Sequence, residues 1–73
     1  MSKSTRFTIE FEREIDGRWI ADIKELPGVL CYGATRGEAQ AKAEALALRV
    51  TADQLETGEK ISELVSIEFN LQS

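Results

Sequence analysis

The chain has 73 residues, a net charge of −4, one cysteine and no histidine. One cysteine excludes an internal disulfide, and the lack of histidine excludes the usual zinc sites, so a domain this small is expected to gain stability by self-association. Nine scattered basic residues are outnumbered by thirteen acids, which disfavours direct binding of nucleic acid. We expect a single domain over residues 1–73.

The beginning of the chain, MSKSTRFTIEFE, lacks the apolar segment of a signal peptide. No part of the sequence approaches the ~20 consecutive apolar residues of a membrane span. Together with the single thiol, these features predict a cytoplasmic protein that does not bind membranes.

Alternating apolar and polar side chains predict a half-buried strand over residues 5–14. Asp16-Gly17 predicts a hairpin turn, and a second strand is expected at about residues 18–24. Each of these strands has one apolar face. The faces carry Phe7, Ile9 and Phe11 on the first strand and Trp19, Ala21 and Ile23 on the second.

The next turn is predicted at Pro27 and Gly28. Proline fixes its own φ and glycine tolerates a positive φ, so the pair suits a tight reversal of the chain. A short third strand is expected near residues 29–32, and Gly33 ends it. Three strands joined by short turns predict an antiparallel meander.

A long helix is predicted after Thr35, ending at about Glu56 with Gly58 as a left-handed cap. Thr35 and Glu38 form a capping box, in which the hydroxyl accepts from the N–H of Glu38 and the carboxylate accepts from the N–H of Thr35. A last strand, apolar at its odd-numbered positions from Val65, is expected over residues 64–71. The order β-β-β-α-β predicts an α+β domain with the helix on one sheet face and the last strand beside the first.

At 100° per residue the helix has two apolar stripes, whereas an ordinary surface helix has one. Polar residues, including Thr51, separate the stripes. The first is expected to cover the sheet, and the second, the outer stripe, to form an interface in a dimer or tetramer. Because alanine is the best helix former, the outer stripe also fits a monomer, but Leu48 and Leu55 favour the interface. The first stripe is Ala39, Ala43, Leu46 and Val50, and the outer stripe is Ala41, Ala45, Leu48, Ala52 and Leu55.

No catalytic motif, cofactor site or metal site is predicted. Cys31 has no histidine as a base and is expected to be a small, inert, partly buried side chain. Trp19 is expected to fill or cover the core. The acids of the strands are expected on an open, solvated sheet face. That face is also expected to carry a possible partner surface formed by Ile20, Leu30 and Tyr32.

A set of motifs in a fixed order extends over roughly residues 7–59. Its members are the alternating first strand, Asp16-Gly17 with Trp19 and Ala21, Leu26-Pro27-Gly28, Gly33-x-Thr35-x-x-Glu38-Ala39, Ala45-Leu46-Ala47-Leu48-Arg49-Val50, Leu55-Glu56 and Gly58-Glu59. Together they resemble the HicB-like antitoxin family of bacterial toxin–antitoxin systems.

This resemblance implies a truncated RNase H-like fold without the catalytic carboxylates of the nuclease. It also implies that the domain binds and occludes HicA, a small basic toxin that cleaves RNA. Many members carry a C-terminal DNA-binding segment, but this sequence stops at Ser73, so a short form without autorepression is expected. The alternatives are an orphan homo-oligomeric domain without a toxin and, more remotely, a degenerate nuclease.

Overall fold

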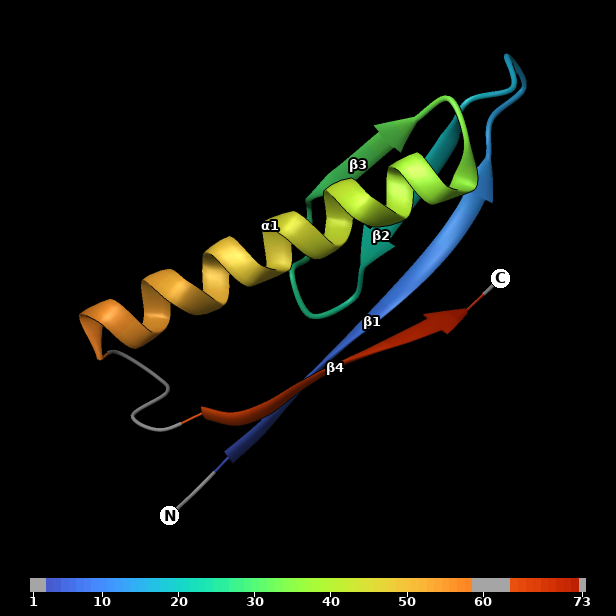
Figure 1. Cartoon of the computed structure of the whole chain (residues 1–73). Helices are drawn as coiled ribbons and strands as arrows, with labels where there is room; N and C mark the ends of the chain where they lie inside the picture. Colours follow the sequence, from blue (N-terminus) through green and yellow to red (C-terminus); the bar gives the residue numbers. More distant parts are fainter. Residues whose placement is uncertain (1–2, 59–63, 73) are drawn as a thin grey trace.

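A computed structural model describes residues 3–58 and 64–72 (Figure 1). The side chain of Val65 and residue Glu59, both named above, lie outside what is described. Three strands come first, followed by one long helix and a fourth strand. The elements are β1 (Lys3–Arg13), β2 (Trp19–Ile23), β3 (Leu30–Gly33), α1 (Arg36–Thr57) and β4 (Leu64–Gln72).

The four strands form one mixed sheet in the order β3-β2-β1-β4. The pairs β1–β2 and β2–β3 are antiparallel, which confirms the meander, and β4 lies beside β1 as predicted. β1 and β4 are parallel. The direction of β4 follows from the helix: β3 runs parallel to β1, and α1 carries the chain back before β4 begins.

The helix covers one face of the sheet, where it lies mainly over β3 and β2 and touches β1 less (Figure 1). The apolar faces predicted for the first two strands both point toward it. Trp19 is partly buried against the core, as expected, and the guanidinium carbon of Arg13 lies 5.8 Å from the centre of its ring. Among the described residues, no helix has the length and apolar character needed to cross a membrane.

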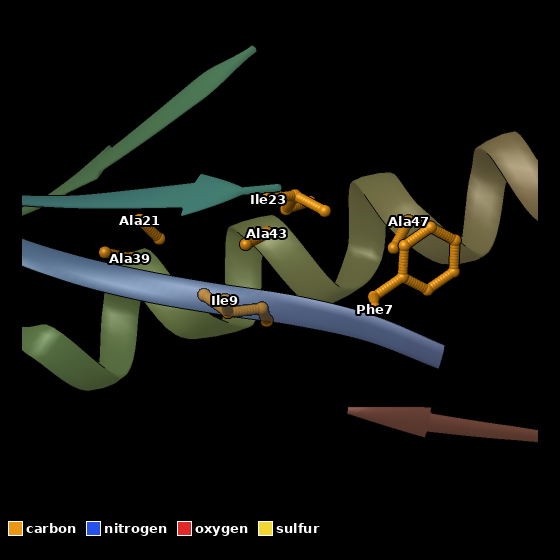
Figure 2. Close-up of a cluster of buried hydrophobic side chains, with 7 residues drawn as sticks. All are labelled: Phe7, Ile9, Ala21, Ile23, Ala39, Ala43 and Ala47. Atoms are coloured by element: carbon orange, nitrogen blue, oxygen red, sulfur yellow. The ribbon is translucent and has the colours of Figure 1, made fainter. Parts of the chain in front are cut away.

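The core is a thin layer between α1 and the sheet (Figure 2). The helix contributes only alanine to the fully buried cluster, and these small side chains allow its backbone to lie close to the strands. Among the described residues, Ile9 and Ile23 are the largest side chains that are fully buried. The cluster consists of Phe7, Ile9, Ala21, Ile23, Ala39, Ala43 and Ala47.

The helix face on the sheet differs from the predicted stripe. Ala39, Ala43, Ala47 and Thr51 are its buried residues, spaced four apart, so the row turns gradually around the helix. Val50 is only partly buried, and the prediction that Thr51 separates the stripes is wrong. The Thr51 hydroxyl donates to Ala47 O at 2.9 Å, which satisfies its polar group inside the core.

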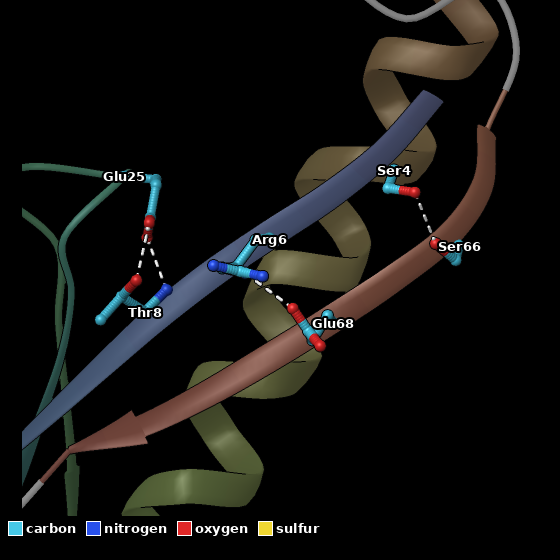
Figure 3. Close-up of polar contacts among 6 residues, drawn as sticks. All are labelled: Ser4, Arg6, Thr8, Glu25, Ser66 and Glu68. Atoms are coloured by element: carbon cyan, nitrogen blue, oxygen red, sulfur yellow. Dashed lines mark hydrogen bonds and ion pairs between the residues drawn. The ribbon is translucent and has the colours of Figure 1, made fainter. Parts of the chain in front are cut away.

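β1 and β4 continue beyond the rest of the sheet. The β2 register begins at Ile9, so the N-terminal part of β1 pairs with β4 alone. Phe7 and Phe69 stack on the helix side, with ring centroids 6.0 Å apart. On the solvent side, Arg6 pairs with Glu68 at 2.6 Å and the Ser66 hydroxyl donates to that of Ser4 at 2.9 Å (Figure 3).

The two strand turns owe their shape to glycines with positive φ. The first turn is a three-residue loop of Ile15, Asp16 and Gly17 (φ 93°), which is closed by a hydrogen bond from Glu14 N–H to Arg18 O at 2.7 Å. In the second turn Val29 N–H donates to Leu26 O at 3.4 Å across Pro27 and Gly28 (φ 87°).

The ends of the helix are capped by side chain and backbone. Thr35 accepts from Glu38 N–H at 3.1 Å, and Gly58 (φ 69°) donates its N–H to Gln54 O at 2.9 Å. One detail differs from the expected capping box. The Glu38 carboxylate accepts from the N–H of Ala34 at 2.8 Å, one residue earlier than Thr35.

Glu25 acts as a cap on the edge of β1 beyond the end of β2 (Figure 3). Its carboxylate accepts from the Thr8 N–H at 2.6 Å and from the Thr8 hydroxyl at 2.9 Å. Partial desolvation raises the pKa of Glu25, but these hydrogen bonds outweigh it and hold the pKa below the usual 4.5. The folded state therefore favours the charged carboxylate.

Glu25→Gln is expected to make the protein less sensitive to acid. A lowered pKa stabilises the fold above the unfolded-state value of 4.5, and this contribution is lost as pH falls through the folded value. The effect should stay below about 1 kcal/mol because the side chain is exposed. Urea unfolding of both proteins between about pH 6 and about pH 3 measures it. Glu56→Gln, at an exposed helix position, is the control; an equal change in both variants would contradict the role of Glu25.

Candidate functional site

The face of the sheet opposite the helix remains open to solvent. Two cross-strand rows lie on it, running from β1 through β2 to β3. One row contains Glu12, Ile20 and Tyr32, and the other contains Glu10, Asp22 and Leu30. The structure thus places Ile20, Leu30 and Tyr32 together on this face, with acids from two strands beside them.

These three apolar residues differ in exposure. Ile20 is buried by its cross-strand neighbours, although no helix covers it. Leu30 is 50% exposed and Tyr32 is 39% exposed. The guanidinium carbon of Arg18 lies 5.0 Å from the centre of the Tyr32 ring. Contact with a partner on this face would therefore be made mainly by Leu30 and Tyr32.

A hollow of about 320 Å³ lies on the open face next to Leu30. Ile20 and Leu30 supply apolar surface, while three carboxylates provide negative charge. One of these, Glu10, pairs with Lys24 at 3.3 Å. The lining residues are Glu10, Phe11, Glu12, Ile20, Asp22 and Leu30.

A separate ion-pair group at the β1–β2 hairpin fixes Arg18 near this face. Arg18 contacts Asp16 at 2.9 Å and Glu14 at 3.1 Å. The Arg18 backbone N–H, which donates to Asp16, and the Arg18 guanidinium lower the pKa of the Asp16 carboxyl. Asp16 therefore stabilises the turn that Asp16-Gly17 predicted, and it holds Arg18 beside Tyr32.

In the part of the chain that the structure describes, no catalytic arrangement of metal-ligating or nucleophilic side chains is present. Within that part, no three His, Cys, Asp or Glu side chains are grouped so as to hold a metal ion. Cys31 lies on the other side of the sheet, half-buried. Burial raises the pKa of its thiol, and nearby Lys42 offsets this only in part. A thiol with a raised pKa is a poor nucleophile at neutral pH.

The outer stripe of the helix faces solvent along most of its length. Leu48 is 48% exposed and Leu55 is 39% exposed, and Ala41 and Ala52 are also exposed. Ala45 is half-buried because it borders a groove between α1 and β3. This groove could not be predicted from the sequence, because helical periodicity alone does not tell which flank of a helix borders an edge strand.

The groove beside β3 has a volume of about 550 Å³. Small and apolar side chains form most of its surface, and two cations lie on the helix side. Its lining residues are Leu30, Cys31, Tyr32, Ala41, Lys42, Ala45, Leu46 and Arg49.

Comparison with protein-family models, with curated proteins and with solved structures returned no match to this chain. The similarity to HicB-like antitoxins therefore rests on the order of the sequence motifs and is carried forward as a hypothesis.

Proposed function

We propose that this chain is a non-enzymatic, cytoplasmic HicB-like domain of truncated RNase H-like type, which neutralises a HicA-type ribonuclease by binding it. The observation that carries the proposal is the hollow on the open sheet face, where exposed apolar surface lies among three carboxylates. A surface of this kind suits recognition of another protein.

The chemistry of the hollow fits a basic partner. Lysine and arginine combine a long apolar stem with a terminal cation. Leu30, which is 50% exposed, would contact the stem, and Glu10, Glu12 or Asp22 would receive the cation. The net charge of −4 would also accelerate encounter with a positively charged toxin. A toxin bound here would have its basic, RNA-binding surface covered.

Glu12→Lys is expected to weaken binding of the small basic protein encoded by the adjacent reading frame. Placing a like charge opposite a cation costs several kcal/mol at an interface, so the Kd should rise by about a hundredfold or more. Calorimetric titration at low and high salt measures this change. Inhibition of RNA cleavage by the same pair gives the functional readout.

Glu56→Lys provides the matched control, because it makes the same change in charge at an exposed helix position. An equal loss of affinity in both variants would show that net charge, and not the open face, determines binding. Metal-dependent RNA cleavage by the purified chain alone would overturn the non-enzymatic assignment.

An orphan homo-oligomeric domain is the second candidate. It is favoured by the exposure of Leu48 and Leu55, which a toxin-binding role on the opposite sheet face does not use. Absence of a small basic protein from the neighbouring reading frames, together with a stable oligomer of the purified chain, would support this candidate.

A further inference from the structure

β3 is an edge strand of the sheet. β2 lies on one side of it, and no strand among the described residues pairs with the other side. Its two outward side chains, Leu30 and Tyr32, are among the most exposed large hydrophobic residues of the described chain. An edge of this composition is a template for pairing with another strand.

The hydrogen bonds of the β1–β2 pair determine where the peptide groups of β3 point. Lys24 N–H donates to Thr8 O at 3.0 Å, so the even-numbered residues of the β2 segment direct their peptide groups to β1. In an antiparallel ladder the peptide groups of successive residues point alternately to the two neighbouring strands. The N–H and C=O groups of Ala21 therefore point to β3, where the partner of Ala21 is Cys31. Leu30 and Tyr32 consequently direct their N–H and C=O groups toward the open edge.

We propose that β3 pairs with β3 of a second copy of this chain, in an antiparallel arrangement about a two-fold axis through Cys31. In this register Leu30 lies opposite Tyr32 of the second copy, and each pair exchanges two backbone hydrogen bonds. This register allows both the backbone hydrogen bonding and the side-chain alternation of a continuous sheet. The outward peptide groups meet one another, and side chains of the same face lie side by side.

The side chains in this register are complementary. On the open face, Leu30 and Tyr32 of both copies form one apolar cluster, which covers side chains that are 50% and 39% exposed in the single chain. On the helix face, Cys31 lies opposite Cys31 of the second copy as a non-hydrogen-bonded pair. Such pairs have Cα atoms about 4.5 Å apart, within the range that a disulfide can span.

The position of the helix independently fits the same dimer. Neighbouring strands are about 4.8 Å apart, so the two-fold axis would lie about half that distance outside β3. Since α1 lies over β3 and β2, its axis would stand about 5 Å from the two-fold axis. Two helices would then lie about 10 Å apart, near the 8–10 Å of packed helices. The helix flank at this contact includes Ala41 and Ala45, whose small side chains permit the approach. It also carries Arg49 and Lys42, and Lys42 pairs with Glu38 of its own helix at 3.8 Å. Leu48 and Leu55 remain outside it.

The dimer would join the two open faces into one eight-stranded sheet. The hollow of each copy borders the central apolar cluster through Leu30, a side chain that the dimer contact and the proposed toxin contact would both use. Dimerisation goes beyond the proposed toxin binding and does not depend on it, since it concerns the edge of the sheet and requires no second kind of protein.

Light scattering coupled to size exclusion tests the proposal on the unmodified chain at high micromolar concentration. The expected mass is twice the 8.1 kDa of one chain. Leu30→Pro removes an outward N–H without removing a hydrogen bond to β2, and proline is tolerated at such edge positions. Its dimer Kd should exceed that of Leu30→Ala, which loses the same side chain but retains the N–H, by about thirtyfold (about 2 kcal/mol), because the two-fold axis repeats the change and two hydrogen bonds are lost.

Cys31 supplies a second readout on the unmodified chain, whether or not Leu30→Pro folds. Diamide oxidises two adjacent thiols to a disulfide, taking up the two protons and two electrons. A covalent dimer that forms faster in the unmodified chain than in Leu30→Ala supports the two-fold at Cys31. A monomer at all concentrations overturns the proposal. So does a dimer that Leu48→Asp disrupts and Leu30→Pro does not.

Discussion

Replacing Ile9 by alanine is expected to unfold a large fraction of the protein near room temperature. Ile9 is fully buried in β1, with Ile23 of β2 on one side and Leu71 of β4 on the other. Loss of such a side chain costs about 2–5 kcal/mol, because buried methyl groups are removed and a cavity remains. A single core in a domain of this size supplies only about 3–5 kcal/mol. One substitution can therefore remove most of the stability.

Urea unfolding followed by the fluorescence of Trp19 measures this loss, because this residue packs against the same core. Leu48→Ala is the control: it also shortens an aliphatic side chain, but at a position 48% exposed. The control should change the free energy of unfolding by no more than about 0.5 kcal/mol. A similar loss in both variants would contradict the placement of the core.

Gly33→Ala is expected to destabilise the protein by about 1–3 kcal/mol, the usual cost of adding a methyl group where there is no room. A Cβ at this position would stand 2.5 Å from the backbone nitrogen of Ala39 and 2.9 Å from the Cβ of Glu38. Backbone atoms of the first helical turn cannot yield without moving the helix. Gly33 thus allows the end of β3 to lie against the start of α1.

Gly37→Ala is the matched control for this prediction. Gly37 lies in the first turn of the same helix, and a Cβ there would meet nothing within 4 Å. Because alanine favours helix over glycine, this variant should be stabilised by up to about 1 kcal/mol. Opposite shifts of the thermal midpoint are expected for the two variants. A shift of the same sign in both would show that the close contact at Gly33 is not limiting.

The elements of the fold were largely predictable because their signals are local. Alternation predicted which faces of β1 and β2 are buried, and Thr35 and Gly58 marked the ends of the helix within one residue. The prediction that the Glu38 carboxylate accepts from Thr35 N–H failed. The carboxylate accepts from Ala34 N–H instead, which depends on how the chain leaves β3. The position of β4 beside β1 was also predicted, and its parallel direction follows from the helical connection.

The rotation of the helix on the sheet was predicted less well. Alanine occurs on every side of α1, so side-chain size and hydrophobicity gave little contrast between faces. At 100° per residue Val50 was placed in the stripe on the sheet, and Thr51, as a polar residue, was placed between the stripes. The structure buries the smaller row because a helix that lies close to two strands has room only for small side chains, and the Thr51 hydroxyl is satisfied within its own helix.

The sequence by itself determined the order of elements, the buried strand faces, the turns and the helix caps, since each depends on residues a few positions apart. Only the tertiary structure decided which helix flank borders β3, where the open-face hollow lies and which strand edge is left unpaired. These features combine residues from strands and a helix far apart in the chain. Their position depends on strand register and helix rotation, which local patterns do not encode.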